Sequence, residues 1–161
     1  MRLSLIVRLL TAFLLLMNLS MWSMAAEEPL AVIMAAGHVK SLNKEDLVLI
    51  FKRKKMFWDD GSKIQPVNLP ASNQSRRAFS QTVLGANPEE LEKFWNDMYF
   101  NGISPPFVLL SDQAVLQFVA ETPNAIGYVP YCKLNNHVEA VLFITAAGHI
   151  SNDANSVTCS K

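Results

Sequence analysis

The segment from Pro66 to Gly85 constrains this chain most, because it joins an apolar strand to a helix through a short polar loop. The loop ends at Ser72 and Asn73, and either residue can cap a helix because a short side-chain oxygen accepts hydrogen bonds from free first-turn amides. Those amides and the helix dipole present positive charge at such a junction. The sequence therefore predicts a helix that ends at Gly85 and carries an anion site at its start.

Two arginines in the predicted first turn allow two interpretations. Arg76 and Arg77 lie on the unfavourable side of the helix dipole, which costs a few tenths to about 1 kcal/mol. An oxyanion bound between the arginines and the amides would reverse that sign. Alternatively, both side chains point into water or pair with a nearby carboxylate. On the first interpretation the ligand-binding residues are Ser72, Asn73, Gln74, Ser75, Arg76 and Arg77.

The first 25 residues have the parts of a signal peptide. Arg2 and Arg8 form a positive start, an apolar run follows, and small residues end at Ala25. The apolar run is shorter than the roughly 20 residues of a membrane span. We expect cleavage after Ala25, export to the periplasm, and a domain of residues 26–161.

Charge and size limit the function classes. Without Arg2 and Arg8, the chain has 12 basic and 14 acidic residues, a net charge of −2. This balance argues against a nucleic-acid partner, because nucleic-acid binders are normally basic. A length of about 135 residues suits one domain.

Two cysteines, Cys132 and Cys159, follow the predicted signal peptide. In an oxidising compartment they predict one disulfide that closes the C-terminal segment, worth about 3 kcal/mol. A metal site needs more ligands than two distant thiols. We therefore expect no metal and no cofactor.

No group of residues indicates catalysis. His38, His137 and His149 lack the spacing of metal ligands, and Ser75 lacks a Gly-x-Ser-x-Gly environment. The acidic pair in residues 59–61 precedes a glycine and is typical of a turn. We expect no catalytic residue, so the chain is not predicted to be an enzyme.

Strand and helix patterns alternate along the chain. Apolar runs of strand length recur at 30–35, 63–67, 107–110, 125–130 and 138–144. Between them, a capping residue followed by helically spaced apolar residues recurs at 43–51, 72–85, 87–101 and 111–122. This alternation predicts one α/β sandwich around a mixed central sheet.

Two helical segments carry features with both a structural and a functional interpretation. The apolar stripe Leu91, Phe94, Trp95 and Met98 is expected to lie in the core rather than to bind a ligand. The basic run at 52–55 follows a helix, where cations are favourable. Its functional alternative is a patch that docks a partner or steers anions.

Several landmarks occur together in a fixed order: 42–51, 58–61, 66–67, 76–79, 83–85, Trp95, 100–102, 111–112 and 123–129. In this order they resemble the second lobe of phosphate-type periplasmic solute-binding proteins, especially short stand-alone members. The run from Pro123 to Val129, with its Ala-Ile-Gly-Tyr-Val sequence, is the sharpest of them. The resemblance covers nearly the whole domain and implies a single-lobe α/β sandwich of the periplasmic-binding-protein type.

The resemblance also implies an oxyanion at the loop and first turn of the central helix. In full-length relatives this loop carries a Ser-Gly-Thr segment, with an arginine a few residues before it. The matching positions here are 73–75, which read Asn-Gln-Ser, and Asn68 or Leu69 in place of the arginine. We expect Arg76 or Arg77 to substitute for the absent charge.

The ligand implied by the resemblance is phosphate or a similar small oxyanion, and the implied partner is an ABC transporter or another envelope protein. Such relatives have a first lobe that this chain lacks. We therefore expect weaker binding by a monomer, or a site completed by a partner or a second copy in a homo-oligomer. The alternative is an envelope accessory protein that keeps the fold without high-affinity ligand binding.

Overall fold

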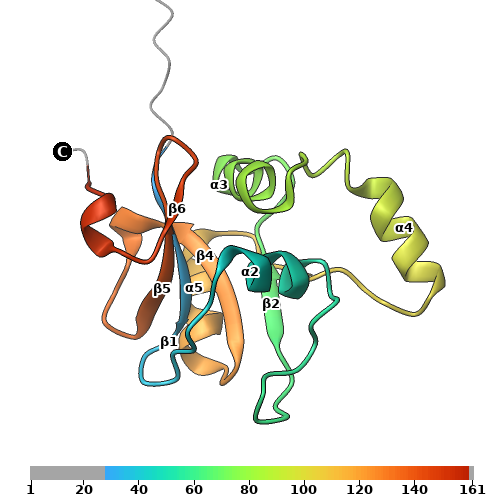
Figure 1. Cartoon of the computed structure of the whole chain (residues 1–161), viewed down its shortest axis with the longest axis horizontal. Coiled ribbons are helices and arrows are strands. Elements are labelled where there is room, and N and C mark those ends of the chain that lie inside the picture. Colours follow the sequence, from blue (N-terminus) through green and yellow to red (C-terminus); the bar gives the residue numbers. More distant parts are fainter. Residues whose placement is uncertain (1–27, 160–161) are drawn as a thin grey trace, which may run out of the picture.

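A computed structural model describes residues 28–159. The predicted signal peptide, residues 1–25, lies outside this range. Within 28–159 no helix is both long and apolar enough to cross a membrane. The elements, shown in Figure 1, are β1 (Leu30–Ala35), α2 (Lys44–Phe51), β2 (Gln65–Asn68), α3 (Gln74–Phe79), η1 (Ser80–Leu84), α4 (Glu92–Phe100), β3 (Phe107–Val108), α5 (Asp112–Glu121), β4 (Ala125–Pro130), η2 (Tyr131–Lys133), β5 (Val138–Ile144), β6 (Ile150–Ser151) and η3 (Ala154–Ser156).

The strands form one sheet in the order β3-β2-β4-β1-β5-β6. Strand β1 is antiparallel to both β4 and β5, whereas β2 is parallel to β3 and β4. The predicted mixed sheet is thus confirmed. Every residue of β1 is buried, which explains why its sequence is a continuous apolar run.

Two adjacent residues of β4 show how helices cover both faces of the sheet, since neighbouring strand residues face opposite ways. A Cβ atom on Gly127 would lie 2.8 Å from Val115 Cγ1 of α5. On the other face, the ring of Tyr128 stacks on Phe79 of α3, with centroids 3.9 Å apart. Phe51 of α2 lies beside the same pair. Helix α5 covers one face and helices α2 and α3 the other, which confirms the predicted sandwich.

Helices α2 and α5 begin at the capping residues that the sequence indicates. Asn43 Oδ1 accepts a hydrogen bond from the Asp46 amide at 2.8 Å, and the Asp46 carboxylate accepts one from the Asn43 amide at 3.2 Å. The Ser111 hydroxyl accepts a hydrogen bond from the Ala114 amide at 3.1 Å. In each helix the cap therefore satisfies the amide of the third helical residue, while the amides of the first two have no acceptor among residues 28–159.

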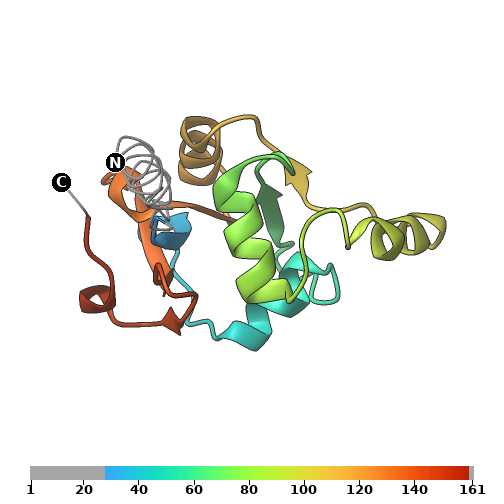
Figure 2. The same ribbon diagram turned by 90° about the horizontal axis from the view of Figure 1, so that it is seen from above.

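Helix α4 differs from the expectation. It begins at Glu92 rather than near Asn87, although Glu90 does accept a hydrogen bond from the Asn87 amide at 2.6 Å. No residue from Glu92 to Phe100 is buried, and Figure 2 shows α4 extending away from the other elements. The prediction that its apolar stripe lies in the core holds only in part: Leu91 is buried and Trp95 packs against the core, whereas Phe94 and Met98 are half-buried. Helical spacing shows that one face is apolar, but not that the same chain covers it.

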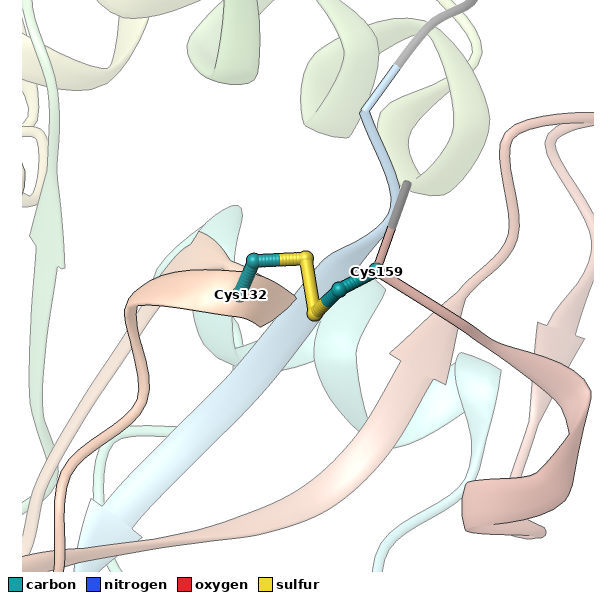
Figure 3. The surroundings of a disulfide bond; sticks show 2 residues. All are labelled: Cys132 and Cys159. Atoms are coloured by element: carbon teal, nitrogen blue, oxygen red, sulfur yellow. A yellow bond between two sulfur atoms is a disulfide. The ribbon is translucent and has the colours of Figure 1, made fainter. Parts of the chain in front are cut away.

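The predicted disulfide is confirmed. Cys132 and Cys159 are bonded, with Cα atoms 5.5 Å apart and 27 residues between them in sequence (Figure 3). The bond joins η2 to the end of the described chain. The weakly patterned tail before it forms β6, which pairs with β5, and the short helix η3.

Candidate anion site at the start of helix α3

Helix α3 begins where the sequence predicts. Asn73 is the capping residue, and its Oδ1 accepts a hydrogen bond from the Arg76 amide at 3.2 Å. Ser72, the other candidate cap, is exposed in the preceding turn. The amides of Gln74 and Ser75 have no acceptor among residues 28–159. Two donors are therefore left open at the positive end of the helix.

The helix continues without a break from α3 into η1, whose five residues have π-helical hydrogen bonding. It ends at Gly85, which adopts a left-handed conformation with φ of 72°. The sequence predicts this end because glycine accepts positive φ without strain. The π-helical turn has no signal in the sequence that we can identify.

The two arginines of the first turn have different surroundings. Arg77 is partly exposed and pairs with Glu89, with Nη1 and Oε1 2.5 Å apart. This ion pair lowers the pKa of the Glu89 carboxyl. Arg76 is 6% exposed, and its buried Nη1 has no hydrogen-bond partner in the part of the chain that the structure describes. The alternative interpretation, in which the arginines pair with a nearby carboxylate, is therefore correct for Arg77 but not for Arg76.

Arg76 lies beside a buried polar pair beneath the loop. The Tyr128 hydroxyl donates to Asn68 Oδ1 at 3.0 Å and lies 3.5 Å from the Leu69 amide nitrogen, which donates to it. Burial raises the pKa of Tyr128, and the nearby positive charge of Arg76 opposes that rise. Since no carboxylate of residues 28–159 forms an ion pair with Arg76, its charge is buried without a counter-ion there.

The start of α5 contributes a carboxylate near the same edge of the sheet. Asp112 Oδ2 pairs with Lys133 Nζ at 2.7 Å, which raises the pKa of Lys133. Its Oδ1 is buried with no partner among the described residues. The charge of Asp112 also raises the pKa of Tyr128, which is consistent with a position close to the buried hydroxyl.

The predicted site residues do not enclose a ligand by themselves. Gln74 is exposed and Ser75 is half-buried; together with Glu28 and Ala78 they line a hollow of about 20 Å³. Such a volume holds roughly one water molecule. An ion bound by the open amides would therefore remain partly exposed to solvent or to another surface.

Sequence reasoning missed Tyr128 as a neighbour of the site. A tyrosine inside a fully buried strand needs a hydrogen-bond partner for its hydroxyl, and Asn68 at the end of β2 supplies it. That requirement was the signal that could have found the pair. Within residues 28–159 no group of three or more His, Cys, Asp or Glu side chains could hold a metal ion.

No protein-family model and no curated protein matches the chain. Among solved structures, it is similar to an ABC-type phosphate transport receptor from Vibrio cholerae, at 20% identity and a TM-score of 0.57. It is also similar to a putative phosphate ABC transporter substrate-binding protein with bound phosphate from Clostridium perfringens, at 23% identity and a TM-score of 0.58. A possible phosphate binding protein from Planctomyces limnophilus matches at 15% identity and a TM-score of 0.53.

These matches show the fold. They cover 71%, 71% and 73% of this chain, but only 45%, 44% and 42% of the three solved chains. The protein therefore has the α/β fold of phosphate-type periplasmic binding proteins and spans less than half the length of those three. The expected resemblance in fold is confirmed.

Proposed function

We propose that this protein is an exported solute-binding protein that holds phosphate or a similar oxyanion at the start of α3 and works with an ABC-type transporter. The observation that carries the proposal is Arg76, whose buried Nη1 lacks a partner among the described residues. An unpaired buried cation is costly, and a bound anion would remove that cost. The fold shared with phosphate receptors supports phosphate as the first ligand to test.

The donors at this position suit an oxyanion. The open amides of Gln74 and Ser75, the Ser75 hydroxyl and the Arg76 guanidinium belong to a single helical turn. A tetrahedral oxyanion has several acceptor oxygens, and hydrogen bonds from a cation to such oxygens are among the stronger ones. A neutral solute could accept the same hydrogen bonds but would leave the charge of Arg76 uncompensated.

Calorimetric titration with inorganic phosphate tests the proposal on protein purified after export from cells that express the full chain. We expect saturable binding by the wild type, at least about tenfold weaker binding by Arg76→Met, and near-wild-type binding by Arg77→Met. Arg77 is a matched control because it is the adjacent arginine and pairs with Glu89 instead. The intact mass of the same sample reports cleavage after Ala25.

Two results would reject parts of the proposal. Unchanged phosphate binding by a folded Arg76→Met protein would reject the site. In that case the Arg76→Lys protein should also bind phosphate as the wild type does. Absence of binding to phosphate, sulfate and other common oxyanions would reject the function. That second result would favour an envelope accessory protein that keeps only the fold.

A further inference from the structure

Helix α4 presents an apolar surface that its own chain covers only in part: Trp95 packs against the core, but the aromatic residues at the end of the helix are exposed. Tyr99 is 68% and Phe100 is 88% exposed, and no residue of the helix is buried. A helix of nine residues is marginal in water without tertiary packing. This arm, residues 92–100, therefore has only the partial burial of Trp95, Phe94 and Met98 to stabilise it.

A groove of about 360 Å³ lies elsewhere on the same chain, between β2, β3 and α5. Most of the residues that line it are apolar, and the lining also includes the cations Arg53 and Lys63. Phe107 lines it and is 66% exposed. The apolar residues of its lining include Ile64, Pro66, Val67, Pro105, Phe107 and Phe118.

The arm and the groove have complementary charge. In the arm, Asp97 pairs with Lys93, whereas Glu92 forms no ion pair with the described residues; the groove lining carries two cations, Arg53 and Lys63. We infer that the groove receives helix α4 of a second copy of this chain, in a reciprocal exchange of arms. An amphipathic helix in an apolar groove is a common mode of recognition, and opposite charges set its orientation.

The segment between α4 and β3 favours exchange over closure onto the same chain. Only residues 101–106 connect the arm to β3, and two of them are prolines, Pro105 and Pro106, which also line the groove. Proline restricts the backbone and stiffens a short connection. In a two-fold dimer each copy gives one arm and receives one, so a single surface serves both roles.

The exposed aromatic area is of the size that such a dimer needs. With roughly 200 Å² for each aromatic side chain, Tyr99, Phe100 and Phe107 expose about half of the ~800 Å² that each partner buries in a typical stable interface. The remaining area is available from the half-buried Phe94 and Met98 of the arm and from Pro105 and Phe118 of the groove, because Ile64 and Val67 are already buried.

Light scattering with size-exclusion chromatography, over a concentration series of the exported protein, tests this inference. We expect a wild-type dimer, and a dimer dissociation constant at least about tenfold higher for the double variant Tyr99→Ser/Phe100→Ser. Leu49→Ser is the matched control because Leu49 is an exposed aliphatic residue on α2 that neither lines the groove nor belongs to the arm. It should leave the dimer unchanged.

A charge exchange tests the pairing itself. Lys63→Glu and Glu92→Lys should each weaken the homodimer several-fold, while an equimolar mixture of the two should form heterodimers, because each arm then meets a groove of opposite charge. A monomeric wild type would overturn the inference. This result is expected if the arm binds the groove of its own chain or binds a different protein. A dimer that survives the arm double variant would overturn it too.

Discussion

The Tyr128 hydroxyl satisfies two buried groups beside the candidate site, Asn68 Oδ1 and the Leu69 amide. We expect Tyr128→Phe to lower the free energy of unfolding by about 1–2 kcal/mol, because Asn68 Oδ1 would lose its partner while the ring still stacks on Phe79. Urea unfolding measures this difference. Tyr131→Phe serves as the control, since Tyr131 is half-buried and its hydroxyl forms no hydrogen bond with the described residues.

Equal stability of Tyr128→Phe and wild type would contradict this expectation. It would mean that the buried side-chain amide of Asn68 finds another hydrogen-bond partner. The Tyr131→Phe control should change the free energy of unfolding by less than about 0.5 kcal/mol.

The sequence also indicates which of the two adjacent arginines in the first turn is buried. Residues 76, 79 and 83 follow helical spacing, so Arg76 shares a face with Phe79 and Val83, both of which are buried. Arg77 lies about 100° further around the helix and reaches Glu89. The helix face therefore predicts which arginine is buried. It does not predict that the buried one lacks a carboxylate partner, because that depends on tertiary packing.

At the level of elements, the disulfide holds the C-terminal tail, whose own contacts are few. We expect the double variant Cys132→Ser/Cys159→Ser to lose about 2–4 kcal/mol of unfolding free energy, because a link across 27 residues restricts the unfolded chain. Chemical unfolding with and without reductant measures the loss. Reductant should destabilise the wild type to the level of the variant and leave the variant itself unchanged; equal stability of both oxidised proteins would contradict the expectation.

The elements that the sequence predicted well are those whose partners are dictated by local pattern. Strands β1 and β4 are continuous apolar runs and lie fully buried in the middle of the sheet. In α5 the helically spaced residues Val115, Leu116 and Val119 are all buried, as expected. The tail and α4 were predicted less well because β6 depends on a partner strand and because, within residues 28–159, the core covers Trp95 of α4 but leaves Phe94 and Met98 half-exposed.

At the level of the whole molecule, two exposed carboxylates make the free energy of unfolding depend on pH in the acidic range. Hydrogen bonds from Lys40 and Ser62 hold the pKa of Asp60 well below its ordinary 3.8, and Arg77 lowers that of Glu89 from 4.5. A carboxyl with a lower pKa in the folded state adds stability that is complete above its unfolded pKa and is lost as the pH falls through its folded pKa.

We therefore expect the urea midpoint of the wild type to fall as the pH drops below about 5, towards 2. Asp60→Asn and Glu89→Gln should each make this fall shallower, because the neutral side chain no longer binds a proton on unfolding. Glu45→Gln is the control, since Glu45 is exposed on α2 and forms no ion pair with the described residues. A variant that keeps the full wild-type acid slope would contradict the role of its ion pair.

The position of β1 in the sheet has a consequence for biogenesis. Leu30 lies opposite Pro130 on one side and Ile144 on the other. The first strand of the described chain can therefore pair only after about a hundred further residues have been synthesised. A nascent polypeptide that does not yet include β5 cannot complete the middle of the sheet, where β1 lies between β4 and β5. In the export that we propose, the centre of the sheet would therefore remain open until nearly all of the chain had passed through a translocation channel.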